Sequence, residues 1–132
     1  MTTETSAAPG VPRAFKLTAT MPGAPEVDHP RPERLERGNP RRETWNRVDA
    51  ALPAGRLYAG VWRCEPGRWR IAMGPHEHEL FTVLAGRCRI HAVDGDVVEA
   101  GPGEAIVLPA GFEGSFEVLE ALTKTYAIVD AT

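Results

Sequence analysis

The sequence has only two cysteines, Cys64 and Cys88, and they lie far apart in the chain. They form no paired-thiol motif of the kind that marks a redox site or a metal site. We therefore predict two buried, reduced thiols, as is usual for a protein of a reducing compartment. A disulfide between them and a nucleophilic cysteine remain the alternatives.

Long hydrophobic runs are also missing, and none approaches the length of a membrane span. The first residues, "MTTETSAAPGVPRAF", lack the apolar stretch of a signal peptide, so we expect a cytoplasmic protein. Charge of one sign is not in excess, because 15 basic residues face 18 acidic ones for a net charge of -3. A nucleic-acid partner, which calls for a basic surface, is therefore not expected.

Proline is present in number, and it is distributed unevenly along the 132-residue chain. Seven of the twelve prolines lie in the first 40 residues. Each lacks an amide donor and biases the preceding residue away from helix. We predict a disordered tail over residues 1–12 and an extended arm over residues 13–50 that packs on the remaining domain, with one short helical turn. The expected anchors of the arm are Phe15, Leu17, Leu35 and Trp45.

Beyond the arm, residues 51–132 alternate short apolar runs with Gly and Pro punctuation. Examples of the runs are "RLYAGVW", "ELFTVLA" and "KTYAIV", and no window carries a helical repeat of more than two turns. Evenly spaced short strands with turn signals are typical of an antiparallel sandwich or barrel. The stretch "AVDGDVV" predicts a hairpin, because Asp-Gly supplies the positive φ angles of a tight turn.

Two stretches of this region match the paired motifs of the cupin superfamily. The first is a glutamate, six residues and a glycine, from Glu79 to Gly86, and the second is "GEAIVLPAG", residues 103–111. The chain resembles most closely a group of small single-domain cupins similar to the cupin module of ureidoglycine aminohydrolase and to the ethanolamine-utilisation cupin. The stretches "NPRRETW", "GVWRCEPGRWRI", "PAGFEGSFEVLE" and "TKTYAIVD" carry this resemblance. It implies an all-β, single-domain antiparallel jelly-roll barrel, but no one reaction, because the superfamily hosts many.

The stretch "PHEHE", residues 75–79, places two histidines and one glutamate directly before Glu79, the first residue of the first motif. In metal-binding cupins a His-x-His pair precedes the motif glutamate, and a third histidine comes from the second motif. Counting from Glu79, the resemblance puts the pair at Met73 and Pro75 or at Ala72 and Gly74, and the third histidine at Gly114. Of the usual ligands, this sequence keeps Glu79 alone.

Side chains on a strand alternate between its two faces, so His76 and His78 should face away from Glu79. We predict exposed histidines and no metal. The alternative is a bulge at Gly74–Pro75 that turns a histidine inward. A divalent cation, Zn, Mn or Fe, would then be held by His76, His78 and Glu79.

The same alternation predicts the residues that line the barrel interior. Glu79 and Phe81 share a face, Phe116 lies beside the space left by Gly114, and the resemblance places Lys124 and Tyr126 at the pocket. Trp62 and Trp69 either wall the mouth or pack in the core. We expect Glu79, Lys124 and Tyr126 to be catalytic and Trp62, Phe81 and Phe116 to bind substrate. Alternatively, Glu79 and Lys124 form a structural ion pair. His91 should face outward.

These observations favour a small-molecule enzyme that carries out acid–base chemistry, with or without a metal, on a small polar metabolite. The alternative is a non-catalytic, metal-free cupin that binds or senses such a metabolite. A homodimer is expected in either case, with the arm acting as a clasp across the partner's sheet.

Overall fold

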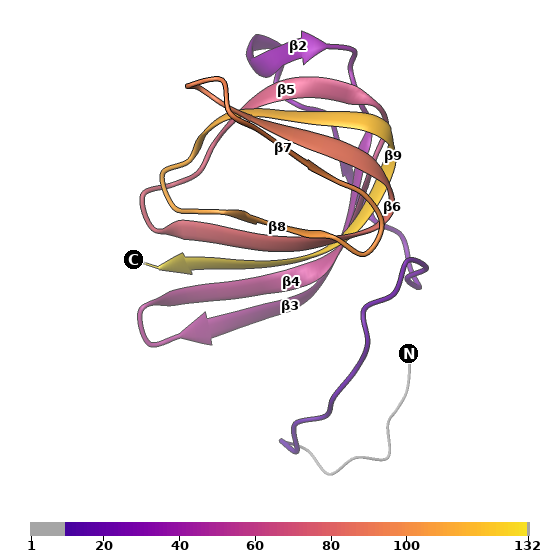
Figure 1. Ribbon diagram of the computed structural model, residues 1–132. Coiled ribbons are helices and arrows are strands. Elements are labelled where there is room, and N and C mark those ends of the chain that lie inside the picture. The colour runs from indigo at the N-terminus through magenta and orange to yellow at the C-terminus, as the bar shows by residue number, and fades with distance from the viewer. Residues whose placement is uncertain (1–9, 132) are drawn as a thin grey trace.

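The computed structural model describes residues 10–131, so residues 1–9 of the predicted tail lie outside it. Nine strands and one short 3₁₀ turn curl into an antiparallel barrel, which confirms the predicted all-β jelly roll (Figure 1). Within this range no helix is long and apolar enough to cross a membrane. The strands are β1 (Glu26–Asp28), β2 (Leu35–Arg37), β3 (Arg42–Leu52), β4 (Gly55–Cys64), β5 (Gly67–Ala72), β6 (Glu77–Ala92), β7 (Val97–Ala100), β8 (Ala105–Leu108) and β9 (Glu113–Ala131).

Two long strands, β6 and β9, hold the barrel together because each runs through both of its sheets. Residues 113–118 of β9 pair with β5, and residues 122–131 pair with β4. On its other edge β9 pairs with β6 along most of its length. The result is one sheet in the order β2-β5-β9-β6-β7 and a second in the order β1-β3-β4-β9-β6-β8.

The glycine of the first motif marks the point where β6 passes from one sheet to the other. The register of β6 against β9 shifts repeatedly between Val83 and Cys88. Gly86 lies there with φ +86°, and a Cβ at this position would lie 2.1 Å from the carbonyl oxygen of Ala121. Only glycine combines a positive φ with such a close approach of two backbones. The motif spacing therefore sets where the barrel wall bends.

The predicted "AVDGDVV" hairpin is confirmed, since β6 and β7 are joined there by a tight turn. Ala92 donates its amide to the oxygen of Asp96 at 2.9 Å, and Gly95 donates to the oxygen of Ala92 at 3.0 Å. Gly95 has φ +96°, as a turn of this kind requires. The two cysteines are buried and free, in agreement with the prediction of reduced core thiols.

The proline-rich arm contributes more regular structure than an extended strap would. The predicted helical turn is the 3₁₀ turn Pro32–Arg34. Strand β3 pairs with β4 along its whole length, so the predicted boundary between residues 50 and 51 lies inside a strand. Trp45 anchors the arm, because its Nε1 donates to the oxygen of Gly23 at 2.9 Å. The predicted anchor Phe15 does not, since it is 63% exposed in a segment without a sheet partner.

Candidate functional site

A cavity of about 530 Å³ lies between the two sheets and is bounded mainly by the inward faces of β3, β4, β5, β6, β8 and β9. Its volume falls in the range of small-molecule sites. The lining is mostly apolar and aromatic, with polar groups on β3, β6 and β9. The lining residues are Glu26, Thr44, Asn46, Asp49, Tyr58, Trp62, Trp69, Ile71, Met73, Glu79, Leu108, Phe116, Lys124, Tyr126 and Ile128.

Three aromatic side chains form one wall of this cavity. Trp69 stacks on Phe116 with ring centroids 5.2 Å apart and planes inclined by 11°. Trp62 meets Phe116 edge-on at 5.6 Å. Strand register produces this cluster, because Trp69 lies opposite Phe116 in the β5–β9 pairing and Trp62 lies opposite Lys124 in the β4–β9 pairing. The wall is therefore a consequence of inward positions on neighbouring strands.

Lys124, one of two lysines in the chain, lies against this wall and is only 5% exposed. Its Nζ donates to Oε2 of Glu79 at 2.8 Å, across the pairing of β6 with β9. The same nitrogen lies over three rings, those of Phe81 at 4.1 Å, Trp62 at 4.5 Å and Phe116 at 4.9 Å. Such contacts attract a cation strongly where water is excluded. The carboxylate and the rings together hold the ammonium in place.

Tyr126 is the third polar residue on the inward face of β6 and β9. Its hydroxyl donates to Oδ1 of Asn46 at 2.7 Å. Burial, and then the negative charge of Glu79, raise the pKa of Tyr126 to about 12. The phenol therefore keeps its proton at neutral pH and acts as a hydrogen-bond donor. Gly60 leaves room for it, since a Cβ there would lie 2.8 Å from the hydroxyl.

The histidines of "PHEHE" do not join Glu79. His76 and His78 are exposed, and Nδ1 of His78 accepts the amide of Ala110 at 3.2 Å. The turn at Gly74 is closed by Glu77, whose Oε1 accepts the Gly74 amide at 2.9 Å. Strand alternation then runs unbroken from Glu77, so the bulge that would have turned a histidine inward is not formed.

The residues present therefore do not fit a cupin metal site. Across residues 10–131 no three His, Cys, Asp or Glu side chains converge as ligands. The carboxylate of Glu79 is paired with Lys124 instead. At Gly114, where the resemblance would place a third ligand, a Cβ would lie 1.9 Å from the carbonyl oxygen of His91. This also corrects the expectation of open space at Gly114, since the backbone of β6 fills it.

Most of the site residues predicted from the sequence meet in this one cavity. Glu79, Lys124, Tyr126, Trp62 and Phe116 all line it. Phe81 does not, because it is fully buried behind Lys124 and supports the ammonium rather than the cavity surface.

The prediction missed the polar residues that β3 contributes, Thr44, Asn46 and Asp49. They belong to the stretch "RETWNRVDA", in which Thr44 and Asn46 are two residues apart, as on a strand, and Asp49 follows three residues later because a bulge lies between Asn46 and Val48. Interpreting this stretch as an arm hid that signal.

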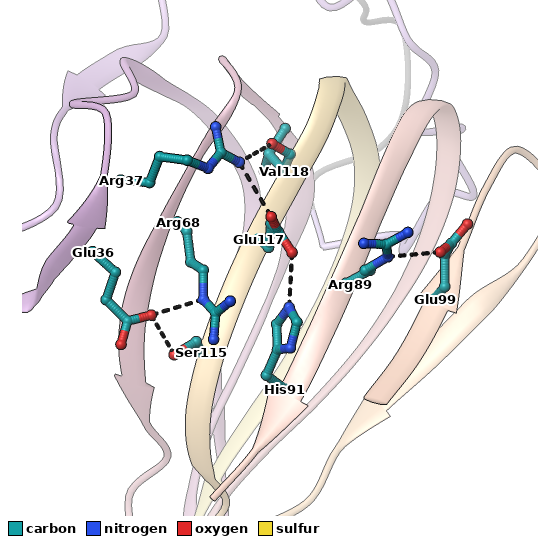
Figure 2. A network of polar contacts seen from close by, with 9 residues as sticks. All are labelled: Glu36, Arg37, Arg68, Arg89, His91, Glu99, Ser115, Glu117 and Val118. Atoms are coloured by element: carbon teal, nitrogen blue, oxygen red, sulfur yellow. Dashed lines mark hydrogen bonds and ion pairs between the residues drawn. The ribbon is translucent and has the colours of Figure 1, made fainter. Parts of the chain in front are cut away.

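A second polar cluster lies on the outer face of the sheet formed by β2, β5, β9, β6 and β7, away from the cavity (Figure 2). Oε1 of Glu117 is 2.8 Å from Nε2 of His91, which faces outward as predicted, and Oε2 is 3.3 Å from Nη2 of Arg37. Burial acts to raise the pKa of Glu117, but the bond to His91 and the charge of Arg37 outweigh it, so that pKa lies below its ordinary value. In the same cluster, Oε1 of Glu36 accepts hydrogen bonds from Nε of Arg68 and from the hydroxyl of Ser115.

Comparison with known families and structures agrees with the barrel architecture. Residues 51–126 match the family model described as the EutQ-like cupin domain. No curated protein sequence is significantly similar to the chain.

Several solved structures share the fold. A protein assigned to ethanolamine utilization from Salmonella typhimurium LT2 is 16% identical with a TM-score of 0.58, over 69% of this chain and 71% of that one. EutQ from Clostridium difficile is 22% identical with a TM-score of 0.54, over 68% of this chain and 64% of that one. A protein of unknown function from Pseudomonas syringae pv. tomato DC3000 is 22% identical with a TM-score of 0.71, over 85% of this chain but 46% of that one. At such identities the similarity establishes the fold alone.

Proposed function

Since the chain belongs to the EutQ-like cupin domain family, we propose that its barrel binds a small polar metabolite and transforms it by acid–base chemistry. One observation carries the proposal: an oppositely charged pair, Glu79 and Lys124, lies in the wall of a largely apolar cavity of about 530 Å³. Ionisable groups in such clefts are common in active sites.

Each residue has a role that its chemistry suits. Glu79 exchanges a proton with the substrate, because a carboxylate can accept one and return it within a single turnover. Lys124 has three N–H donors, of which Glu79 uses one, and it orients a carbonyl or carboxylate oxygen of the substrate. Tyr126 donates a hydrogen bond from its protonated phenol. Trp62 and Phe116 pack against the apolar part of the substrate.

The second candidate is a cupin that binds a metabolite without transforming it. The surroundings of Lys124 favour this alternative, since three rings and a carboxylate hold the ammonium as tightly as a structural ion pair would. A binding protein would be stabilised by its ligand through mass action and would return the ligand unchanged.

A two-step experiment separates the two candidates. Thermal melting of the wild-type protein is measured against three panels of small metabolites: carboxylates, amines and neutral amides. The compound that raises the melting temperature most is then incubated with the protein and followed by proton NMR. Conversion supports the enzyme, whereas binding without conversion supports the binding module, and no stabilisation by any panel would contradict both.

The variant Glu79→Gln assigns the chemistry. If Glu79 moves the proton, turnover should fall by about 10²- to 10⁴-fold while the fold is kept. Glu99→Gln is the matched control, because Glu99 pairs with Arg87 and Arg89 on the outside of the barrel. Unchanged turnover in Glu79→Gln would reject the role of Glu79. Elemental analysis of the same preparations provides a further check, since one equivalent of zinc, manganese or iron per chain would contradict a mechanism that uses only protein groups.

A further inference from the structure

A hollow of about 440 Å³ lies on the outside of the barrel, where β5, the start of β9 and the 3₁₀ turn Pro32–Arg34 meet. Five of its nine lining residues are charged, whereas the lining of the cavity between the sheets is mostly apolar. We call this hollow the arginine pocket. Its charged residues are Arg31, Glu33, Arg34, Arg70 and Glu113.

Two of the three arginines come from one short turn at the edge of the sheet. The amide of Arg34 donates to the carbonyl oxygen of Arg31 at 2.9 Å, which closes the turn. Residues three apart in a 3₁₀ turn lie on the same side of it. Pro30 and Pro32 flank Arg31 and restrict the backbone there. The backbone that carries both guanidinium groups is therefore ordered before any ligand binds.

Arg70 joins these two arginines from β5, where it lies opposite Ser115 of β9. Its Nη2 donates to the carbonyl oxygen of Glu33 at 2.6 Å, and Nη1 of Arg34 donates to the carbonyl oxygen of Arg70 at 3.5 Å. These two bonds tie the turn to the strand. Each uses one of the five N–H donors of a guanidinium group, so donors remain for a ligand.

The arginines of this pocket differ from most others in the chain because no carboxylate between residues 10 and 131 forms an ion pair with them. Eight of the thirteen arginines form such a pair, and three of the other five line the arginine pocket. On the outer face of the same sheet, the arginines drawn in Figure 2 each meet a glutamate. The eight paired arginines are Arg37, Arg41, Arg42, Arg56, Arg63, Arg68, Arg87 and Arg89.

The charge of the pocket favours an anion. Three guanidinium groups around one hollow repel one another, and a negative charge between them removes that repulsion. Glu33 and Glu113 offset part of the positive charge, so the lining keeps an excess of one positive charge in a chain whose net charge is -3. Guanidinium groups bind phosphate oxygens in a bidentate manner, which adds geometric specificity to the attraction.

We propose that the arginine pocket binds the phosphate group of a small molecule, with Arg31, Arg34 and Arg70 as the residues that hold it. Three cationic groups suit a doubly charged anion with several free oxygens better than a carboxylate, which has one charge and two oxygens. The proposal is independent of the function proposed for the cavity between the sheets.

The pocket also has room for an organic part attached to the phosphate. Its volume falls in the range of small-molecule sites. Ala72 and Gly114, which line it, carry no long side chain that could fill it. The carboxylates of Glu33 and Glu113 can accept hydrogen bonds from hydroxyl groups of a ligand. A phosphate ester of a polyol would use both kinds of lining group, and the free phosphate ion would use the arginines alone.

Isothermal titration calorimetry of the full chain at pH 8, where phosphate is mostly a dianion, tests the proposal. Inorganic phosphate, glycerol 3-phosphate and acetate are titrated at one ionic strength. Both phosphate compounds should bind saturably, and acetate should bind at least about 10-fold more weakly. If glycerol 3-phosphate binds more tightly than phosphate, the ligand is an ester; otherwise it is the free ion. No saturable binding of either up to about 10 mM, or acetate binding as tight as phosphate binding, would overturn the proposal.

Two variants locate the site. Arg70→Gln and Arg31→Gln should each raise the dissociation constant for phosphate by at least about 10-fold. The side chain of Arg31 bonds to no residue between 10 and 131, so Arg31→Gln decides the matter should circular dichroism show that Arg70→Gln does not fold. Arg89→Gln is the matched control, because it removes the same charge from the same sheet outside the pocket, and its constant should stay within about 2-fold of the wild type. An unchanged constant in either folded pocket variant, or an equal loss in Arg89→Gln, would overturn the proposal.

Discussion

Lys124→Met separates the contribution of charge pairing from that of packing inside the barrel. Methionine has nearly the length of the lysine stem and keeps favourable contacts with the rings of Trp62, Phe81 and Phe116. What the substitution removes is the ammonium. Glu79 then stays in the cavity wall, with a side chain only 13% exposed, without its partner at 2.8 Å.

Removing one member of a buried ion pair costs about 3–5 kcal/mol, mostly because the other charge is left unpaired. Glu79 faces a cavity that admits water, so we expect the lower end, about 3 kcal/mol of unfolding free energy. The double variant Glu79→Leu with Lys124→Met removes both charges and should lie within about 1 kcal/mol of the wild type. The two substitutions should therefore be strongly non-additive.

Urea unfolding at pH 7, followed by tryptophan fluorescence, measures these differences from the midpoints at constant slope. Arg89→Met is the control, because the Arg89–Glu99 pair lies on the surface with side chains 44% and 37% exposed, and its loss should cost less than about 1 kcal/mol. If Lys124→Met and Arg89→Met are equally destabilised, water screens the Glu79–Lys124 pair, and the pair is not the buried feature on which the proposed function rests.

Two further predictions concern other titratable groups. Burial raises the pKa of Cys64 to about 12 and that of Cys88 to about 11. A thiol reagent at pH 8 should therefore label both cysteines in urea but neither of them in the folded protein within minutes. Rapid labelling of the folded protein would show that the core opens at these positions. Glu117 has a pKa below the ordinary 4.5, so its stabilising contacts are fully present above that pH and are lost as the pH falls through the lowered value. Between pH 5 and 3 the urea midpoint of the wild type should therefore drop by more than the urea midpoint of Glu117→Gln. The difference should correspond to less than about 1 kcal/mol of unfolding free energy. Parallel plots of midpoint against pH for the two proteins would contradict this prediction.

The sequence was most informative where spacing is tied to backbone geometry. The first motif ends at Gly86, whose positive φ and close contact with the oxygen of Ala121 no other residue tolerates. The hairpin at Asp94–Gly95 follows from the same requirement. Strand alternation also predicted that Glu79 and His78 point to opposite faces of β6, because neighbouring residues of a strand always do so. The roles of Glu79, Lys124 and Tyr126 stay predictions, although the structure brings the three to one cavity.

What the sequence hid was the part played by residues before 51. The density of prolines argued for an extended arm, but the last of them in that region is Pro40, and from Arg42 onward β3 is free to pair. Asn46 and Asp49 enter the cavity through that pairing, a hairpin with the next strand, β4, which the predicted boundary between residues 50 and 51 divided. Phe81 was misplaced for a related reason. Alternation gives the face of a side chain but not its depth, and Lys124 lies between this ring and the cavity.

The order of the strands has a consequence for how the chain acquires its shape. β4, β5 and β6 all pair with β9, and β9 is made after all three. During synthesis the edges of these strands that face β9 therefore stay unpaired until β9 has been made. Contacts between segments so distant in sequence also form slowly. Folding should be held back until the final strand emerges, and in that interval the nascent chain offers open edges to any neighbour able to add a strand.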